Sequence, residues 1–371
     1  MENNLNQLVK LSQRYGQNPE YIIAGGGNSS FKNDEKMWVK ASGTSMGNIE
    51  EDGFVCLDRE KMQIISGKKY SENVSAREQE VKEDLHNAIL FPEGKRPSVE
   101  ASMHEIIRYA FIMHTHPTLV NGVLCANNSK EVINDLFGDE VVYVPYTDPG
   151  YILFKEVDLA LQKYRTEKGK EPQIIFLENH GVFVGAETTD EINQIYTEIE
   201  NKLNQKIKQY PQSTQEQKEI IPADIKKSIE SCDELQRMAT VFDSSDLTKT
   251  FIANEQSFEK VNVPFTPDNI VYCKSKYLFV IEHSNLSDQV AAFKINNGYN
   301  PKVIVFKGVG IVAVEESLKS AQIVMDVFKD MMKVSYLSES FGGPRPMTAR
   351  QIDFIDNWEV ENYRRQMSKA N

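Results

Sequence analysis

Two histidines separated by one residue, His114 and His116, are the residues of this chain best placed to do chemistry. They end a run between Arg108 and Pro117 in which apolar side chains recur as in a buried β-strand. Because side chains two apart on a strand point to the same face, both imidazoles are predicted to leave the sheet together. Two converging neutral imidazoles suit a transition-metal ion such as zinc. A hydrogen-bonded core pair would show the same spacing, so further ligands are needed.

Glu100 and His180 are the two further candidate ligands. Glu100 follows Ser98, which we predict to be the N-cap of a helix with Glu100 in its first turn. The helix dipole alone favours an acidic residue there, so this position also has a plain structural explanation. His180 lies in a polar break between two strand-like runs, before a glycine that lets the backbone turn. Its structural alternative is a turn histidine hydrogen-bonded to the backbone.

Three histidines and one glutamate would leave a coordination position for substrate, as a catalytic zinc site requires. Zinc is the expected ion, and another divalent metal would suit the same ligands. The remaining histidines have no comparable setting and are predicted to lie on the surface or on a helix face: His86, His104 and His283.

Two polar turns that contain glycine predict an anion site near the N-terminus. The first, Gly25–Ser30, follows a predicted strand at Tyr21–Ala24, and the second, Ser42–Ser45, follows a predicted strand at Lys36–Ala41. A dinucleotide-binding motif needs a helix directly after its glycines, and here a second strand follows instead. Backbone N–H groups and hydroxyls in such turns can hold a phosphate. A plain hairpin with turn-forming residues is the alternative.

Composition limits the classes of protein that this chain can be. Its 371 residues, 40% of them hydrophobic, can bury more than one ordinary core. The net charge of −12 argues against a nucleic-acid surface. No apolar run approaches the roughly 20 residues of a membrane span, and the polar N-terminus lacks a signal-peptide core. Four scattered cysteines fit a reducing cytosol, so we expect a cytoplasmic protein without a disulfide framework.

The chain also repeats a pattern of helix, strand, polar break, strand and helix. The segment that starts near residue 148 has an echo near residue 288, in which Val309 falls opposite His180 and Gly310 opposite Gly181. Two unrelated units of this common kind are the alternative. The polar, proline-containing stretch between the copies predicts a linker. The C-terminal tail is predicted to be a helix that docks on its own chain or on a neighbouring subunit through an apolar stripe of Ile352, Phe354, Ile355 and Trp358.

Five segments, taken together, resemble the class II aldolase/adducin family. In order along the chain, they are GGGNSSFK (Gly25–Lys32), KASGTSMGNI (Lys40–Ile49), RPSVEASMH (Arg96–His104), HTHP (His114–Pro117) and ENHGVFVG (Glu178–Gly185). The resemblance is greatest to the aldolase part of bifunctional rhamnulose-phosphate aldolase/lactaldehyde dehydrogenases, which share a counterpart of Phe341–Arg365. We expect the dehydrogenase part to be absent here.

The alternation of strands and helices predicts an α/β protein, and the resemblance implies a three-layer α/β/α arrangement with a mostly antiparallel central sheet. A smaller α/β domain is expected to follow. The expected divisions are a catalytic domain at 1–205, a linker at 206–224, the smaller domain at 225–340 and a helical tail at 341–371.

The resemblance implies a zinc-dependent aldolase that cleaves a 6-deoxyketose 1-phosphate, such as rhamnulose 1-phosphate, to dihydroxyacetone phosphate and lactaldehyde. The metal ligands would be Glu100, His114, His116 and His180, with Glu100 also acting as general acid/base. The expected phosphate- and substrate-binding positions are Asn28, Ser42, Gly43 and Ser98, with Ser29 and Thr44 beside them. Where the family often has paired serines before its glutamate, this chain has Ser98-Val99.

Several alternatives stay open. The same ligands would serve a sugar-phosphate epimerase or dehydratase of the same superfamily, and an adducin-like binding module without catalysis is the alternative of a different class. The resemblance also implies a homo-oligomer in which a tyrosine reaches across a subunit boundary. The corresponding stretch, Asn121–Asp139, has no tyrosine, although Tyr143 and Tyr146 follow closely.

Overall fold

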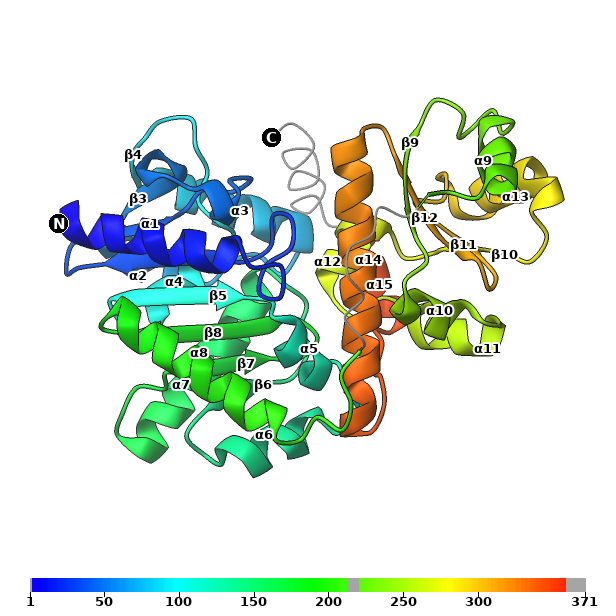
Figure 1. Cartoon of the computed structure of the whole chain (residues 1–371). Helices are drawn as coiled ribbons and strands as arrows, with labels where there is room; N and C mark the ends of the chain where they lie inside the picture. The colour runs from blue at the N-terminus through cyan, green and yellow to red at the C-terminus, as the bar shows by residue number, and fades with distance from the viewer. Residues whose placement is uncertain (1, 212–219, 358–371) are drawn as a thin grey trace. The chain divides into compact units, whose positions relative to one another are not determined.

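The computed structural model describes residues 2–211 and 220–357, which form two compact units (Figure 1). Of the described residues, the first unit comprises 2–124 and 128–206, and the second comprises 125–127, 207–211 and 220–357. Part of the predicted linker at 206–224 lies outside the described residues, and its last two residues already belong to a helix. No helix in the described ranges is both long and apolar enough to cross a membrane.

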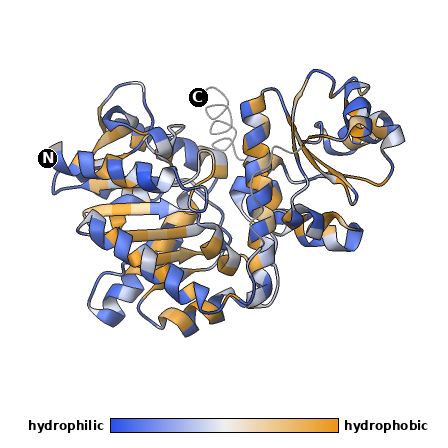
Figure 2. Ribbon diagram, viewed as in Figure 1, coloured by the Kyte–Doolittle hydropathy of each residue, from blue (hydrophilic) through white to orange (hydrophobic). Residues whose placement is uncertain are grey.

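The first unit is built on an eight-stranded sheet in the order β4-β3-β2-β1-β5-β8-β7-β6. Every neighbouring pair is antiparallel except β6 and β7, which run parallel. The central strands carry the apolar residues of the core, as the hydropathy colouring of β5 and β8 shows (Figure 2). The strands are β1 (Asn28–Lys32), β2 (Lys36–Lys40), β3 (Phe54–Asp58), β4 (Ile89–Phe91), β5 (Phe111–Thr115), β6 (Val142–Val144), β7 (Ile174–Leu177) and β8 (Gly181–Ala186).

Helices cover the two faces of this sheet. On one face α1 and α8 pack against β5 and its neighbours, and on the other face α2, α4 and α7 pack over the sheet. The helices of the unit are α1 (Glu2–Gly16), α2 (Arg59–Gly67), α3 (Val74–Asn87), α4 (Ala101–Ile106), α5 (Thr118–Leu124), α6 (Ser129–Phe137), α7 (Tyr151–Lys168) and α8 (Thr189–Asn204). The mixed α/β composition agrees with the predicted class.

Two local predictions are wrong. Tyr21–Ala24 is not a strand but a turn segment, in which Ala24 has a φ of 54°. Both Tyr21 and Ile22 are buried without joining a ladder, and the Tyr21 ring packs against Tyr15 of α1 and Tyr196 of α8. The first hairpin instead joins β1 to β2, so Asn28 stands on a strand rather than in a glycine turn.

The second unit repeats part of the first. Its sheet has the order β10-β11-β12-β9, with β10 parallel to β11 and the other pairs antiparallel. This is the order and direction of β6-β7-β8-β5 in the first unit. The four strands are β9 (Ala239–Asp243), β10 (Leu278–Val280), β11 (Val303–Phe306) and β12 (Gly310–Glu315). The predicted echo is therefore a repeated half-sheet.

Helices surround the second sheet as well, and α14 packs on β9 and β12. They are α9 (Ala223–Glu230), α10 (Asp246–Ile252), α11 (Glu255–Phe258), α12 (Pro267–Cys273), α13 (Leu286–Asn297), α14 (Leu318–Ser338) and α15 (Ala349–Asn357).

The tail helix α15 docks on α12 of its own unit. Ile355 is buried there, and Asp356 pairs with Lys274 at 3.4 Å. Ile352 and Phe354 are half-buried, and Trp358 lies outside the described residues. All four cysteines are free and buried: Cys56, Cys125, Cys232 and Cys273.

Candidate metal centre

Three neighbouring strands place the first candidate ligand. In the register of β1, β5 and β8, Asn28 lies opposite His114 and His114 lies opposite Phe183. Directly opposite residues of antiparallel strands share a face, so these three side chains stand side by side on the sheet. The Phe183 ring stacks on the His114 imidazole with centroids 4.1 Å apart and planes inclined by 17°. This contact fixes the plane of the buried imidazole.

His114 is held in the form that can bind a metal. Its Nδ1 lies 3.1 Å from the backbone oxygen of Val182. Because a carbonyl can only accept, Nδ1 carries the proton and Nε2 keeps its lone pair, on the side where His116 and Glu100 lie. A hydrogen bond of this kind on the far nitrogen is the usual support of a metal-ligating histidine. His114 is completely buried, so the ring has no other freedom.

The three predicted histidines converge. One ligand atom from each of His114, His116 and His180 can be chosen so that all lie within 4.8 Å of one another. The Nε2 atoms of His114 and His116 are 3.0 Å apart. Tetrahedral zinc with bonds of about 2.05 Å holds neighbouring nitrogens roughly 3.3 Å apart, so the residues fit such an ion with small adjustments. Among the described residues this is the one such group of three potential ligands.

The turn between β7 and β8 brings His180 to the end of β5. A Cβ atom on Gly181 would come within 2.4 Å of the Thr115 backbone oxygen and 2.7 Å of His116. Glycine is therefore needed for close approach, whereas the left-handed backbone of the turn is taken by Asn179, with a φ of 54°. The sequence pattern predicted that Gly181 lets the backbone turn, whereas in the structure Asn179 takes the left-handed conformation.

Glu100 faces two of the three histidines. Its carboxylate oxygens lie 3.5 Å from Nε2 of His114 and 3.5 Å from Nε2 of His180. It occupies the N-cap position of α4 rather than the predicted first turn, and its side chain caps no backbone group of the helix. Ser98, two residues earlier, accepts a hydrogen bond from the Glu100 backbone N–H at 3.3 Å. The carboxylate is thus turned toward the imidazoles and away from the helix end.

His104 is a buried neighbour of the histidine cluster, a position that the sequence pattern did not predict. It was predicted to lie on a surface or helix face, yet it is completely buried beside the histidine cluster. Its Nδ1 lies 2.7 Å from Ser30 Oγ, and its Nε2 is hydrogen-bonded to Asn28 Oδ1. Burial lowers the pKa of His104 well below its ordinary value, which keeps the ring neutral.

One signal for His104 was present in the sequence. It follows Glu100 by four residues, which places the two on the same side of a helical turn. Two other histidines, His86 and His283, were predicted to lie on the surface or on a helix face together with His104. His86 is exposed, as predicted, and the side chain of His283 lies outside the described part of the structure.

The structure separates the predicted phosphate positions into groups. Asn28 and Ser98 are joined by a hydrogen bond of 3.2 Å between Asn28 Nδ2 and Ser98 Oγ. The turn at Ser42, Gly43 and Thr44 lies beside the same segment, because the Ser42 N–H donates to the Arg96 backbone oxygen at 2.8 Å. Residues 42–44 are partly exposed.

Ser29 does not join this group. Its side chain leaves the opposite face of β1 from Asn28, and its Oγ lies 2.7 Å from Ser12 Oγ of α1, completely buried. The structure therefore gives Ser29 a packing contact in place of a position near Asn28.

The two tyrosines beyond the predicted stretch surround Glu178. Tyr143 donates its hydroxyl hydrogen to Glu178 Oε1 and also lies 3.1 Å from Ser129 Oγ. Glu178 Oε2 accepts from the Tyr146 backbone N–H at 2.8 Å. Glu178 thus anchors the segment after β6 to the turn that carries His180.

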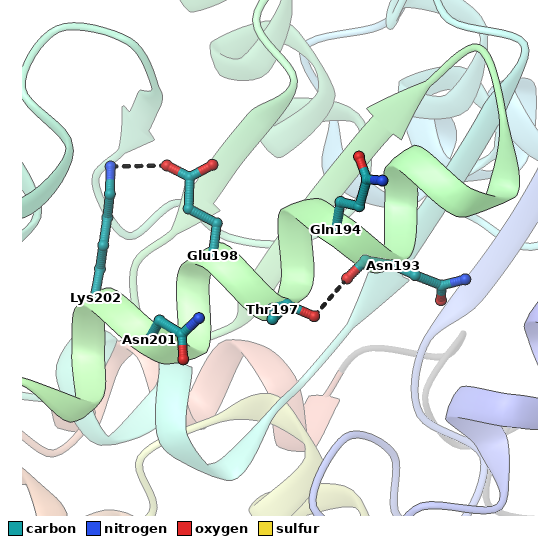
Figure 3. A pocket seen from close by; sticks show the side chains of 6 residues that line it. All are labelled: Asn193, Gln194, Thr197, Glu198, Asn201 and Lys202. Carbon is teal, nitrogen blue, oxygen red and sulfur yellow. Dashed lines mark hydrogen bonds and ion pairs between the residues drawn. The ribbon is translucent and has the colours of Figure 1, made fainter.

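A shallow surface pocket on α8 is a different feature. All the residues that line it come from one helix, and the drawn hydrogen bond and ion pair stay within that helix (Figure 3). They are Asn193, Gln194, Thr197, Glu198, Asn201 and Lys202. None of the predicted site residues is among them.

Comparison with known proteins agrees with the placement of these residues in the first unit. Residues 6–207 match the family model of the class II aldolase and adducin N-terminal domain. The L-fuculose phosphate aldolase of Methanocaldococcus jannaschii is 25% identical over 179 aligned positions, which cover 47% of this chain and 80% of that protein. The uncharacterized oxidoreductase YuxG of Bacillus subtilis (strain 168) is 22% identical over 406 aligned positions. That alignment covers 96% of this chain but 58% of the Bacillus protein, so the chain spans little more than half of that relative's length.

A solved structure shows a similar extent of likeness. The N-terminal class II aldolase domain of a conserved protein from Thermoplasma acidophilum is 25% identical with a TM-score of 0.47, covering 54% of this chain and 92% of that one. The family model covers more than half of the present chain, including every residue of the histidine cluster. The chain belongs to the class II aldolase and adducin family.

Proposed function

We propose that this protein is a divalent-metal-dependent aldolase that cleaves a 6-deoxyketose 1-phosphate to dihydroxyacetone phosphate and lactaldehyde. Zinc is the proposed ion. The observation that carries the proposal is the convergence of His114, His116 and His180, with the Glu100 carboxylate 3.5 Å from two of them. A binding module without catalysis has no need of such a cluster, because three imidazoles and a carboxylate packed together are costly unless they hold a ligand.

Each residue has a distinct part in the proposed reaction. The three imidazoles would hold the ion, which supplies Lewis-acid stabilisation of the negative charge that develops on substrate oxygens. Glu100 would be a ligand at rest and, once substrate takes its place, would transfer a proton as general acid/base. Its half-buried carboxylate does not cap α4 and faces the imidazoles, which places it for both parts.

The phosphate would bind at the turn of Ser42, Gly43 and Thr44 together with Ser98 and Asn28. These residues offer amide, hydroxyl and backbone N–H donors without a lysine, which suits a phosphate in a protein of negative net charge. The name of the Methanocaldococcus relative, a fuculose phosphate aldolase, supports a phosphorylated sugar as substrate.

We extend the proposal to the architecture and assembly. The first unit would be a three-layer α/β/α catalytic domain, and the second unit would be a smaller domain without metal chemistry. The protein would act in the cytoplasm as a homo-oligomer, without nucleic-acid or membrane partners.

The direct test is to load the purified protein with zinc and incubate it with a panel of ketose 1-phosphates. We expect dihydroxyacetone phosphate and lactaldehyde in equal amounts from at least one 6-deoxyketose 1-phosphate, and no product from His114→Ala. Formation of an epimer or a dehydrated sugar without dihydroxyacetone phosphate would replace the aldolase proposal by the epimerase or dehydratase alternative.

A further inference from the structure

A buried chain of hydrogen bonds runs from β1 through α4 to the Glu100 carboxylate. Ser30 Oγ lies 2.7 Å from His104 Nδ1, and His104 Nε2 is hydrogen-bonded to Asn28 Oδ1. Asn28 Nδ2 then donates to Glu100 Oε2 at 2.5 Å. Asn28, Ser30 and His104 are all buried. Water therefore does not compete for these groups, and each depends on its protein partners.

The direction of every bond in this chain follows from the carboxylate at its end. An ionised carboxylate only accepts, so Asn28 must present its NH₂ group to Glu100 and its oxygen to His104. His104 must then donate from Nε2, which leaves Nδ1 as the acceptor of the Ser30 hydroxyl hydrogen. The second hydrogen of the Asn28 amide agrees with this direction, because it reaches Ser98 Oγ at 3.2 Å.

From this directional chain, we propose that His104 is a positioning residue: it fixes the amide of Asn28 and, through Asn28, the orientation of the Glu100 carboxylate beside His114 and His180. Without the Nε2–H donor, the Asn28 amide could rotate and turn its oxygen toward the carboxylate. Glu100 would then lose the hydrogen bond that holds Oε2, and its other oxygen would no longer be held toward His180.

The inference rests on the proposed function only in that Glu100 is taken as a metal ligand and proton-transfer group. Its test uses metal affinity and so does not need turnover. Outer partners of metal ligands typically change metal affinity about 10–100-fold when they are removed. A loss of that size is expected when the His104 donor is removed.

Two substitutions of His104 differ in which nitrogen they retain. His104→Gln places an amide near the position of Nε2, so it can still donate to Asn28, whereas His104→Asn reaches only the position of Nδ1. We expect His104→Asn to weaken Co²⁺ binding about 10–100-fold and to alter the visible spectrum of the bound ion, and His104→Gln to stay close to wild type. Equal losses in the two variants would mean that His104 only fills space against Phe183, whose ring centroid lies 5.4 Å from that of His104.

A double-mutant cycle tests whether the effect passes through Asn28. His104→Asn combined with Asn28→Ala should bind Co²⁺ no more weakly than Asn28→Ala alone, because the positioning residue then has nothing to position. Losses that add in the double variant would overturn the proposal.

Ser30→Ala gives a second route if His104→Asn does not fold. Removal of the hydroxyl lets His104 adopt either tautomer, so Co²⁺ affinity should fall in the wild-type background but not in the His104→Gln background. The same fall in both backgrounds would contradict the positioning role. Coupling in these affinities without any aldol cleavage would leave the inference standing and refute the proposed function instead.

Discussion

At the scale of single residues, the site depends on which nitrogen of His114 faces the other candidate ligands. The hydrogen bond from His114 Nδ1 to Val182 directs its Nε2 toward His116, and the alternation of a strand brings both rings to one face. This much follows from the sequence, because the spacing of two residues and the apolar run are both visible there. The role proposed for His104 does not follow from the sequence, because it depends on the tertiary contact of α4 with Asn28 and Ser30 of β1.

Removal of one imidazole should abolish stoichiometric zinc binding. His114→Ala leaves two histidines and a carboxylate, and it opens a cavity under Phe183, so we expect less than stoichiometric zinc after dialysis. His86→Ala, which changes an exposed histidine, is the matched control and should bind zinc as wild type does. Metal analysis of the two purified variants makes the comparison. Full zinc in His114→Ala would rule out the cluster as the metal site.

The phosphate proposal predicts a selective change in KM. Ser42→Ala removes a partly exposed hydroxyl at the turn, so KM for a phosphorylated ketose should rise while activity on the same sugar without phosphate stays unchanged. Ser29→Ala is a useful contrast. Loss of the buried hydrogen bond with Ser12 should lower the free energy of unfolding by about 1 kcal/mol without a selective rise in KM. Equal changes on both sugars would mean that the Ser42 turn serves only the fold.

At the scale of elements, the short helix α4 is the part that carries Glu100, and contacts at its C-terminal end hold it. Lys32 of β1 donates from Nζ to the backbone oxygens of His104, Glu105 and Ile107. Glu105 is also paired with Arg59 of α2 at 2.8 Å. A six-residue helix is not stable by itself, so these tertiary contacts are what fixes its position.

Strand prediction succeeded or failed for identifiable reasons. The runs at β5, β7 and β8 were predicted because both faces of these central strands are buried and read as apolar sequence. The strand at Asn28 was missed because its residues are polar, and they are buried only by pairing with one another and with α1 and α4. Tyr21 and Ile22 show the reverse case, since packing buries apolar residues there outside any strand.

Lys32 should make stability depend on pH. Burial lowers its pKa from 10.5 to about 7, and the Glu105 carboxylate offsets part of that effect. The unfolded chain therefore binds the Lys32 proton more tightly than the folded chain, so stability should rise with pH from about 7 toward 10.5. The contribution of this one group is at most roughly 1.4 kcal/mol per pH unit.

Urea unfolding of Lys32→Met at several pH values between 7 and 10 tests this contribution. The variant should lose the rise in stability, although it also loses the three hydrogen bonds that hold α4. Lys10→Met, at an exposed position of α1, should keep the wild-type dependence. A wild-type slope in Lys32→Met would show that the proton is bound equally in the two states.

At the scale of the whole molecule, one half-sheet occurs twice and only one copy carries the histidines. Strand registers place Phe242 of β9 at the position of His114 in β5. His114 lies opposite Phe183, the third residue of the neighbouring strand β8, and Phe242 lies opposite Val312, the third residue of the neighbouring strand β12. The Phe242 ring occupies the space above Gly310, where any Cβ would lie 2.3 Å from it. The repeat was visible in the sequence through Val309 and Gly310, but the replacement of His114 by Phe242 required the register.

The repeat predicts one metal ion per chain. The second copy has Phe242, Ser244 and Val309 at the positions of His114, His116 and His180, so titration with Co²⁺ should saturate at one equivalent. In His114→Ala the spectral change should disappear completely. A second equivalent that survives this substitution would place a metal site outside the histidine cluster.

The tail helix should stabilise the second unit without contributing to metal binding. Ile355 is buried against its own unit, so Ile355→Ala should lower the free energy of unfolding by about 2–4 kcal/mol. Ile352 is half-buried, so Ile352→Ala should lower it by less. Zinc affinity should not change, because all four proposed ligands belong to the first unit.

Assembly can be measured separately from stability. Light scattering should report an oligomer for the full-length chain, and the same state for Ile352→Ala if α15 docks only on its own unit. Dissociation of Ile352→Ala to a monomer would instead give this face of α15 a role between subunits. A monomeric and fully active wild-type protein would remove the proposed shared site.

In the proposed reaction, Glu100 removes a proton from the carbon next to a carbonyl, and the ion held by the histidine cluster stabilises the negative charge that results. Dihydroxyacetone phosphate alone, incubated with zinc-loaded protein in D₂O, tests it without knowledge of the partner aldehyde. Proton NMR should show exchange of one of the two hydrogens at C3, because Glu100 removes a proton there and returns a deuteron. Glu100→Gln should retain zinc and show no exchange. Absence of exchange in the zinc-loaded wild-type protein, or equal exchange in Glu100→Gln, would contradict the account.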